Sequence, residues 1–421
     1  MSVKISKHNF RIAILSDRCP PLNGGGIANA HYNLFRILRE KGFDARIFTY
    51  LDEMDRVPGH KAEKNIYRYG ANRFDRSIIR LSDSLKHKFS KRIFRKKPDV
   101  GLAYQNGLIR LAAKGIRKLN SRLKDFDPDT VILPDFGAPG YTLKKIKTAR
   151  HIHIAHNIPL RYLSNPLIGI HSKGDAELAI RKEQKSLTKI DAVICPSNYM
   201  KQVFRKTFKF NGDIRVIPNL LDNSLIFAVP KKDIHSLLKT ENDIPVIYIP
   251  SAGSNIKGER YVVEIIRRLS TLLSGKVAFY LSGSLTEAQK YELGLFPGKF
   301  HILAPGTTGY EENMGYVKDC KLCVSPTLLE SFGMAMLEAQ FCGLPCVAFD
   351  VEGVGELITN GVNGFRVPCP DVEQLIQKAM DLLTNNQLYQ DMVKSMESFV
   401  RDKYASDKIV EDYLTVIENR N

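Results

Sequence analysis

The sequence predicts an α/β protein with two doubly wound parallel sheets, each in a domain of its own. At 421 residues the chain is too long for one hydrophobic core. Short strand-like runs alternate with longer helical patterns from one end of the chain to the other. These runs are apolar at nearly every position, which is typical of strands that helices cover on both faces.

The strand-like runs form two series, separated by a polar stretch with few helix signals at 222–243. The first series is 11–16, 45–50, 130–135, 151–157, 191–197 and 214–219, and the second is 245–251, 276–283, 299–306, 320–327 and 345–350. We therefore expect domains at 1–222 and 223–400, with a helix at 401–421 that crosses back to the first domain. Ligands of such sheets bind at the carboxyl ends of strands, so the chemistry is expected in the turns that follow them.

The composition excludes several classes of protein. With 43% apolar and 25% charged residues, 29 Gly and 20 Pro, the chain is neither collagen-like nor disordered. No run approaches the roughly 18 apolar residues of a membrane span, and the amino-terminal segment has only a short apolar run. These features predict a cytoplasmic protein, in which the seven Cys are free thiols.

The formal net charge of +17 favours a polyanionic partner. Much of it lies in a predicted helical insertion at about 72–125, where the stretch 80–124 has 14 Lys and Arg against Asp83 and Asp99. Apolar residues recur there at helical spacing, with basic residues on the other side. Such a helix suits an anionic membrane surface, which would make the protein peripheral at the inner face of the membrane, or a phosphorylated acceptor. A solvated face is the alternative, and nucleic acid is disfavoured because no aromatic residues are interleaved with the charges.

Two patterns resemble metal sites, and neither is favoured. Cys320-x2-Cys323 followed by Cys342-x3-Cys346 has the spacing of a four-thiolate zinc site, but small buried residues beside strands are the simpler interpretation. The three His of the run 151–157 do not share one strand face. We expect no metal site.

The most informative stretch follows the run at 320–327. A turn carries Glu330, and a helix of good helix formers runs from Gly333 until Gly343 stops it in a left-handed conformation. The amino end of this helix offers free N–H groups that would hold a diphosphate without a metal. Glu338, further along, can accept hydrogen bonds from two adjacent hydroxyls, as on a ribose, while Glu330 can reach a sugar beyond the phosphates.

The segment ESFGMAMLE, from Glu330 to Glu338, resembles the E-x7-E motif of retaining glycosyltransferases of the GT-B fold, family 4. The resemblance spans nearly the whole chain, and it implies two Rossmann-like domains that face each other across a cleft. The first domain would bind the acceptor and the second the nucleotide sugar. Further motifs fall in the family's order: Gly24-Gly25-Gly26 after the first strand, DAVICPSNYMKQVF at 191–204, VIPNLLD at 216–222 and VEGVGELITNGVNGFRVP at 351–368.

The same resemblance implies roles for the residues of the motif in the second domain. Glu338 would bind the nucleotide ribose, and Glu330 would hold a hydroxyl of the donor sugar. Backbone amides of Phe332, Gly333 and Met334 would contact the sugar and the phosphates. These residues would form the core of the donor site.

In the first domain, the resemblance points to the glycines and to one histidine. Gly24, Gly25 and Gly26 would let their loop approach the donor phosphate and the acceptor, because Gly tolerates positive φ and has no side chain. A plain tight turn is the alternative, and the segment is not a G-x-G-x-x-G fingerprint, so no dinucleotide cofactor is implied. His156 matches the family's His that contacts the donor sugar, and its imidazole could donate a hydrogen bond in either protonation state.

One loop departs from the family pattern. Family members carry an Arg and a Lys after the first strand of the second domain, where both neutralise the diphosphate. Here Lys257 remains, while Ser251 or Ala252 stands at the Arg position. A small side chain cannot replace a bidentate guanidinium, so either Arg260 or a residue of the basic first domain substitutes for it, or the donor is held differently.

The activity that the resemblance implies is metal-independent, retaining transfer of a hexosyl or N-acetylhexosaminyl group from a UDP- or GDP-sugar, with no cofactor. The acceptor would be a glycan, glycolipid or other cell-surface molecule, as in polysaccharide or lipopolysaccharide biosynthesis. The leaving phosphate oxygen would take the acceptor's proton, with Lys257 supporting the departing charge. Two alternatives are a non-catalytic GT-B-like subunit that assists a transferase, and a GT-B-fold phosphorylase or epimerase.

Overall fold

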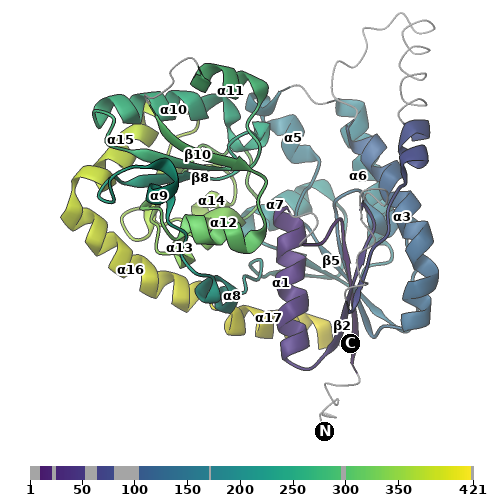
Figure 1. Cartoon of the computed structure of the whole chain (residues 1–421). Helices are drawn as coiled ribbons and strands as arrows, with labels where there is room; N and C mark the ends of the chain where they lie inside the picture. The colour runs from purple at the N-terminus through teal and green to yellow at the C-terminus, as the bar shows by residue number, and fades with distance from the viewer. Residues whose placement is uncertain are drawn as a thin grey trace, which may run out of the picture. The chain divides into compact units, whose positions relative to one another are not determined.

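The computed structural model describes residues 10–20, 25–52, 64–79, 104–169, 172–294 and 300–418. Two compact units are present: the first unit is Met1–Leu220 with Asp407–Asn421, and the second unit is Leu221–Ser406. Each unit contains one parallel sheet flanked by helices, which confirms the predicted fold class (Figure 1). The stretch 80–103 of the predicted basic insertion lies outside the described residues.

The first unit has a seven-stranded sheet in the order β3-β2-β1-β4-β5-β6-β7, in which every paired strand is parallel to its neighbour. Its strands are β1 (Arg11–Ser16), β2 (Asp44–Thr49), β3 (Ile66–Tyr67), β4 (Thr130–Pro134), β5 (Arg150–Ile154), β6 (Ala192–Cys195) and β7 (Asp213–Val216). Its helices include α1 (Gly26–Glu40), α3 (Tyr104–Phe126), α4 (Pro139–Thr142), α5 (Leu160–Ser164), α6 (Lys173–Leu187), α7 (Asn198–Thr207) and α17 (Ser406–Glu418).

Two hydrophobic cores, one on each face of this sheet, explain why strands such as β1 and β4 are mostly apolar. Ile12 and Ile14 of β1 pack in one core with α1 and α17. Ala13 and Leu15, which point to the opposite face, pack in the other core with α3. Alternate residues of β1 therefore serve different cores, and the polar residues of this strand, Arg11 and Ser16, lie at its two ends.

The second unit has a six-stranded parallel sheet in the order β10-β9-β8-β11-β12-β13. Its strands are β8 (Val246–Ile249), β9 (Ala278–Ser282), β10 (His301–Gly306), β11 (Leu322–Ser325), β12 (Cys346–Phe349) and β13 (Gly364–Val367). Its helices are α8 (Asn223–Ala228), α9 (Ile234–Leu238), α10 (Glu259–Leu272), α11 (Glu287–Gly294), α12 (Tyr310–Val317), α13 (Met334–Phe341), α14 (Val354–Leu357), α15 (Val372–Thr384) and α16 (Asn386–Tyr404).

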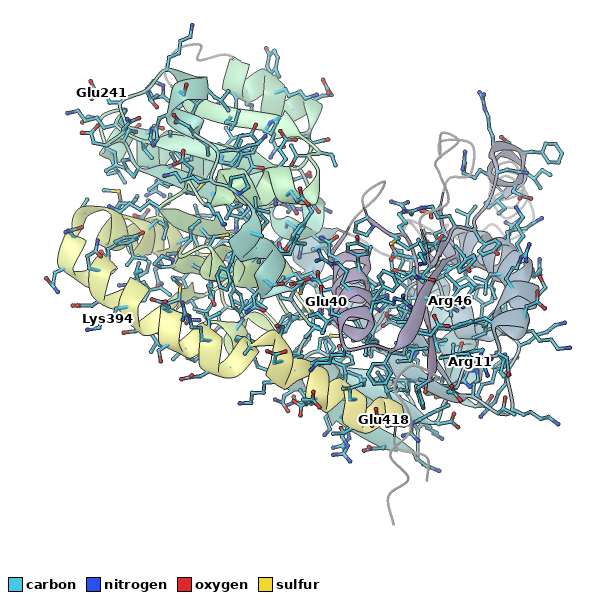
Figure 2. The ribbon with its side chains drawn as sticks, turned by 60° about the horizontal axis from the view of Figure 1, so that its bottom comes forward. Arg11, Glu40, Arg46, Glu241, Lys394 and Glu418 are labelled. Carbon is cyan, nitrogen blue, oxygen red and sulfur yellow. The ribbon has the colours of Figure 1, made fainter. Side chains whose placement is uncertain are left out.

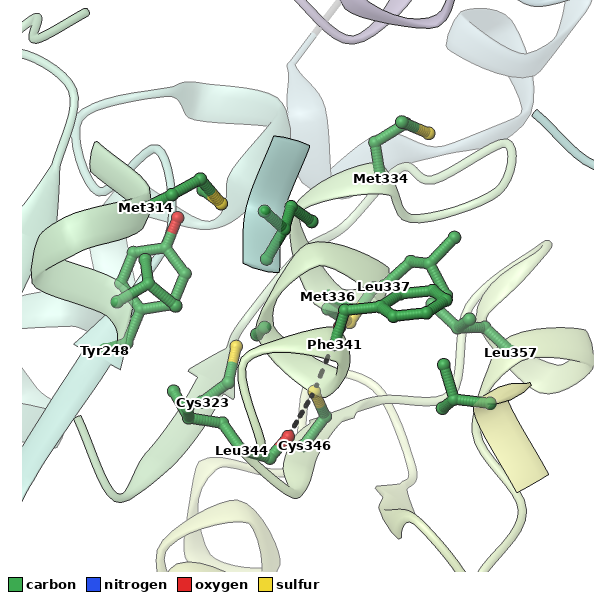
Figure 3. Packing of buried hydrophobic residues seen from close by; sticks show 14 of the residues in the cluster. Tyr248, Met314, Cys323, Met334, Met336, Leu337, Phe341, Leu344, Cys346 and Leu357 are labelled. Atoms are coloured by element: carbon green, nitrogen blue, oxygen red, sulfur yellow. Dashed lines mark hydrogen bonds between the residues drawn. The ribbon is translucent and has the colours of Figure 1, made fainter. Parts of the chain in front are cut away.

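Side chains of β11, β12 and α13 pack in the second unit's core together with Tyr248 of β8 and Met314 of α12 (Figure 3). Cys323 and Cys346 lie opposite each other on β11 and β12, and both are buried among apolar side chains. The Cys346 thiol donates to the backbone oxygens of Met336 at 3.5 Å and Leu344 at 3.7 Å. The cysteines of the zinc-like spacing thus include two that pack inside the core.

Two short helices, α8 and α9, occupy the stretch 222–243 that the sequence predicts to be poor in helix. Asp222 and Asp233 each accept a hydrogen bond from the first turn of one of these helices, at 3.1 Å and 2.9 Å. Side-chain caps of this kind stabilise helices that are too short to form alone. The prediction of a helix-poor stretch was wrong because it rested on the polar composition and did not consider side-chain caps.

The outer faces of the long helices are polar. On α16, Met392, Met396 and Val400 are buried, whereas Lys394 lies on the exposed side (Figure 2). On α3, buried apolar residues from Leu108 to Leu123 line one side, as the amphipathic pattern predicts. Among the described residues, no helix is long and apolar enough to span a membrane.

Candidate active site

The strand order of the second unit reverses between β8 and β11, the two strands at its centre. In doubly wound sheets ligands bind beyond the carboxyl ends of the strands at such a switch point. The loop after β8 carries Lys257, and the loop after β11 carries Glu330. The fold therefore brings two of the predicted site residues to the edge where a ligand is expected.

Lys257 and Glu330 contact each other directly. The Lys257 ammonium donates to Glu330 Oε2 at 2.6 Å and lies 3.4 Å from the backbone oxygen of Leu329. Their side chains are 26% and 15% exposed, so this ion pair is partly shielded from water. The sequence assigns these residues to different parts of the donor, and the structure places both within one contact.

Backbone hydrogen bonds join the two loops that carry this pair. The backbone N–H groups of Leu328 and Leu329 both donate to the oxygen of Ile256, at 3.0 Å and 3.1 Å. Gly258 has a φ of 79°, and a Cβ built there would lie 2.0 Å from the backbone oxygen of Pro326. The absence of a side chain at Gly258 is what lets the loops approach so closely.

Glu352 is a further residue of this edge that the sequence reasoning did not single out. Its Oε2 accepts a hydrogen bond of 2.6 Å from the backbone N–H of Glu330, and the Gly353 N–H donates to the Glu330 oxygen at 2.9 Å. Glu352 itself has a positive φ of 46°. The sequence could have pointed to Glu352, because this residue lies in the segment 351–368 that follows the strand at 345–350.

The helix α13 begins directly after the loop of Glu330. Gly333 precedes it with a φ of 107°, and Gly343 follows it with a φ of 93°, as the predicted left-handed stop requires. Phe332 is buried, with its ring against Tyr404, and Met334 is also buried. The side chains of Phe332 and Met334 thus belong to the core, and contact of the backbone amides of Phe332, Gly333 and Met334 with a ligand stays a prediction.

Glu338 is a buried carboxyl group on α13, with 5% of its surface exposed. Burial raises its pKa to about 8, while the Tyr310 hydroxyl at the start of α12 acts to lower it. The Tyr310 hydroxyl and the Glu338 carboxyl group are neighbours, but within the described part of the chain neither this hydroxyl nor Glu338 Oε1 makes a hydrogen bond of ordinary geometry. Two unsatisfied polar atoms at one place are costly to bury, and a hydroxyl-bearing ligand would satisfy them. Tyr310 is a second residue that the sequence reasoning missed.

Ser251 stands where the family's Arg is expected. Its backbone is left-handed, with a φ of 51°, and its N–H donates to Ser282 Oγ at 3.1 Å. Arg260, the candidate substitute, lies in the first turn of α10 and donates to Asn255 Oδ1 at 3.2 Å. Lys257 is thus the residue of this loop whose charge is directed at the motif of Glu330.

In the first unit, His156 lies beyond the carboxyl end of β5 and contacts His31 of α1. The two Nε2 atoms are 3.4 Å apart, and His31 Nδ1 lies 3.3 Å from Ser16 Oγ at the end of β1. All three side chains are buried. The contact with His31 could not be found by spacing along the chain, because 125 residues separate the two rings.

The predicted glycines of the first unit open α1. Gly25 precedes the helix with an extended backbone, at a φ of −163°, so the left-handed conformation that the sequence suggested for this loop is not used there. A Cβ built at Gly25 or Gly26 would meet no atom within 4 Å. Gly24 lies outside the described residues.

The histidines of β5 face the core of the first unit. His153 Nδ1 lies 3.6 Å from Glu183 Oε1, and burial lowers the pKa of His153 to about 3. His151 Nδ1 bonds the backbone oxygen of Ala149 at 3.1 Å. In the described ranges, no three His, Cys, Asp or Glu side chains are grouped so that they could hold a metal ion.

Known proteins resemble this chain in sequence and in structure. A relative, N-acetyl-alpha-D-glucosaminyl L-malate synthase of Bacillus anthracis, is 24% identical over 285 residues, a match covering 63% of this chain and 73% of that protein. Sucrose-phosphate synthase from Thermosynechococcus elongatus has a similar structure, with a TM-score of 0.72 and 16% identity over 97% of this chain and 98% of that one. The Anabaena protein Alr3699/HepE, solved with UDP and glucose, has a TM-score of 0.65 and 16% identity over 97% and 99% of the two chains.

The structural matches, at this low identity, show the GT-B fold. Two family models add the sequence relationship: "Glycosyltransferase Family 4" matches residues 24–225, and "Glycosyl transferases group 1" matches residues 229–399. Each match covers most of one unit. The chain therefore belongs to the group 1 glycosyltransferases of family 4.

Proposed function

We propose that this chain transfers a hexosyl or N-acetylhexosaminyl group from a nucleotide sugar to a glycan or lipid-linked acceptor, with retention of configuration and without a metal. The observation that carries the proposal is the contact between Lys257 and Glu330 at the switch point, with the buried Glu338 on the helix that follows. This set offers a cation for a diphosphate, a carboxylate for a sugar and a second carboxyl group for a ribose.

Each residue has a proposed part in the reaction. The Lys257 ammonium and the backbone N–H groups at Gly333 oppose the charge that develops on the departing diphosphate. Glu330 orients the sugar and Glu338 holds the ribose. The acceptor hydroxyl loses its proton to the leaving phosphate oxygen as the new glycosidic bond forms on the face that the phosphate leaves. His156, in the first unit, acts on the donor sugar.

We propose a UDP-sugar as the first donor to test, before GDP-sugars. The name of the Bacillus anthracis relative indicates N-acetylglucosaminyl transfer, and the Anabaena structure was solved with UDP and glucose. The first name supports a gluco-configured sugar, and the second structure supports a uridine nucleotide. No cofactor beyond this substrate enters the proposal.

We also propose that the acceptor is held at an anionic membrane surface, with the protein peripheral at its cytoplasmic face. The support is charge: Lys and Arg outnumber Asp and Glu by 22 in the first unit. This excess already allows for every acidic residue of the unit, including Asp75, which pairs with Lys114 of α3 at 3.0 Å. The excess is available to lipid headgroups or to a phosphorylated acceptor.

The experiment is a donor and acceptor screen that measures release of nucleoside diphosphate. UDP- and GDP-sugars are each incubated with the full chain, with and without a mixture of lipid-linked and soluble glycan acceptors, and with and without EDTA. The expected result is release that requires acceptor and is unaffected by EDTA, with a product of the same anomeric configuration as the donor by NMR. An inverted product would refute retention, and loss of release in EDTA would refute metal independence.

A non-catalytic subunit that binds a nucleotide sugar or a partner transferase is the second candidate. Ser251 favours it, because this small residue stands where a diphosphate-binding Arg is expected. Thermal shift separates the two functions, since a ligand at 100 times its dissociation constant stabilises by about 2.7 kcal/mol whether or not turnover occurs. Stabilisation by a donor without release in any acceptor mixture would favour the second candidate.

A further inference from the structure

Three polar side chains of the first unit contact one another in series: Ser16, His31 and His156. They come from the end of β1, from α1 and from the turn after β5. Ser16 Oγ lies 3.3 Å from His31 Nδ1, and His31 Nε2 lies 3.4 Å from His156 Nε2. The three residues are between 0% and 4% exposed, so water does not compete with these contacts.

Both imidazoles are neutral at physiological pH. Burial lowers the pKa of His31 to about 3, and burial together with the neighbouring His31 and His153 holds the pKa of His156 well below its usual value. A neutral imidazole carries one N–H. The contact between the two Nε2 atoms therefore needs the hydrogen on one of them and the lone pair on the other.

The Ser16 hydroxyl decides which nitrogen carries the hydrogen. Among the described residues, His31 Nδ1 is its one hydrogen-bond partner. A buried hydroxyl that fails to donate leaves its O–H unsatisfied, which costs more than leaving one of its two lone pairs unused. Ser16 thus donates to His31 Nδ1, His31 has its hydrogen on Nε2 and donates it to His156, and His156 must carry its own hydrogen on Nδ1.

The backbone around His156 fixes the position of its ring. The Arg161 guanidinium donates to the His156 backbone oxygen at 3.1 Å, and the next residue, Asn157, donates its N–H to Asp135 Oδ2 at 2.6 Å. In the described part of the chain, His156 Nδ1 has no hydrogen-bond partner. The N–H of this nitrogen is therefore available to a ligand.

We propose that Ser16 and His31 are positioning residues that hold His156 as the Nδ1–H tautomer, so that His156 offers a neutral hydrogen-bond donor to an oxygen of the bound sugar. Free histidine in water favours the other tautomer, in which Nε2 carries the hydrogen. Only the identity of the ligand rests on the proposed function. The tautomer itself is a property of the first unit.

The test is long-range ¹H–¹⁵N NMR of the full chain with ¹⁵N-labelled histidine, which distinguishes the two tautomers by the shifts of the ring nitrogens. The His156 signals are assigned by their loss in His156→Gln. The expected result for the unmodified protein is one tautomer of His156 with the hydrogen on Nδ1. Detection of the Nε2–H tautomer or of an imidazolium at pH 7 would overturn the proposal, and this measurement requires neither a variant nor turnover.

The substitution Ser16→Ala tests whether the Ser16 hydroxyl fixes the tautomers of His31 and His156. Without the hydroxyl, His31 Nδ1 is free to take the hydrogen, so His31 and His156 should show mixed tautomers, and transfer should fall about tenfold with an unchanged dissociation constant for the nucleotide. The matched control is Ser186→Ala, which removes another buried hydroxyl of the same unit, one that donates to the Lys182 backbone oxygen. A single unchanged tautomer in Ser16→Ala would overturn the role of Ser16. If no donor is turned over, the proposed function fails while the tautomer result stands.

Discussion

Lys257 and Glu330 are each other's counter-charge, and this pairing determines how a diphosphate can bind. In the proposed site, a phosphate that binds the Lys257 ammonium competes with the Glu330 carboxylate for it, and a displaced Glu330 becomes available to a sugar hydroxyl. The two proposed roles are therefore coupled through one exchange of partners. Binding of the nucleotide alone should separate Lys257 from Glu330.

Lys257→Ala should weaken binding of nucleoside diphosphate ten- to hundredfold, because a charge-assisted hydrogen bond contributes about 1.5–3 kcal/mol. Glu330→Ala should bind nucleoside diphosphate at least as tightly as the unmodified protein, since Lys257 is released, while transfer falls. Calorimetry of UDP and GDP binding measures the affinity of both variants. Undiminished affinity in Lys257→Ala would identify another cation, with Arg260 the first to test, as the real counter-charge.

Glu338 should make nucleotide affinity depend on pH. With a pKa near 8 it is mostly protonated at pH 7, whereas ribose hydroxyls donate best to the carboxylate. Affinity should therefore rise as the pH increases through about 8, and binding at pH 7 should release a proton. Calorimetry in two buffers with different ionisation heats measures that proton.

The matched variant for this prediction is Glu338→Gln, which keeps the size of the side chain and removes its titration. It should bind nucleotide roughly ten- to hundredfold more weakly and lose the proton release. Tyr310→Phe should shift the midpoint of the pH dependence of nucleotide affinity to higher pH, because it removes the hydroxyl that lowers the pKa of Glu338. Proton release that persists unchanged in Glu338→Gln would refute the assignment.

The sequence could predict those parts of the site whose residues lie close together along the chain. Glu330, Gly333 and Glu338 belong to one short motif, so local spacing was enough to place them on a turn and a helix. The Lys257 contact joins positions 73 residues apart, and the His31 contact joins positions 125 apart. Only the folded chain brings such pairs together, and the roles of these residues in transfer are still predictions.

Among the elements, the buried strands and the edge strands β7 and β10 were predicted, whereas the edge strands β3 and β13 were not. The strands β1 and β4 are apolar on both faces because each face meets its own core. The edge strands β3 and β13 have two and four residues and are only partly buried, so their sequences carry no such pattern. The short helices α8 and α9 were missed because a side-chain cap, not periodicity, marks where they begin.

The helix α17 completes a core that begins at the other end of the chain. Its buried residues pack with β1 and α1, and Ile417 accepts a hydrogen bond from the Thr130 hydroxyl at 3.2 Å. Burial of each large apolar side chain stabilises by roughly 1.5–3 kcal/mol, so losing the whole set exceeds what a typical domain can spare. The set is Ile409, Val410, Tyr413, Leu414, Val416 and Ile417.

Deleting residues 406–418 should therefore unfold the first unit and leave the second unit folded. Hydrogen exchange read by peptide measures this, with rapid exchange expected in β1 and β4 and unchanged protection in β8 and β11. The triple substitution of Ile409, Tyr413 and Ile417 by Ala should reproduce the effect in weaker form. Protection of β1 that survives the deletion would show that α17 is dispensable.

Over the whole molecule, charge is divided between the units. The first unit has an excess of 22 basic residues, whereas in the second unit Asp and Glu outnumber Lys and Arg by 5. The excess of basic residues extends beyond the predicted insertion, because the stretch 141–215 contributes 15 basic residues against 5 acidic ones. An anionic surface would attract one unit and not the other.

The full chain should sediment with vesicles of phosphatidylglycerol and phosphatidylcholine and not with phosphatidylcholine alone. Binding should fall as salt rises, because each cation near the surface contributes about 1 kcal/mol and is screened within ~10 Å at 0.1 M salt. Charge reversal to Glu in the insertion should abolish binding, at Lys91, Arg92, Arg95, Lys96 and Lys97. The control reverses exposed residues of the second unit, namely Lys239, Lys276, Lys290, Lys394 and Arg401. Equal loss in both variants would mean that binding follows total charge.

The chain enters the second unit at Leu221, leaves it at Ser406 and only then supplies α17 to the first unit. During synthesis, at about 5–20 residues per second, the ribosome spends roughly 10–40 s on the second unit while the first lacks its last helix. Nascent domains usually mature in the order in which they emerge, and here that order is inverted. The unit made first is the last to close its core, and through that interval the apolar surface that α17 will cover is open to chaperones.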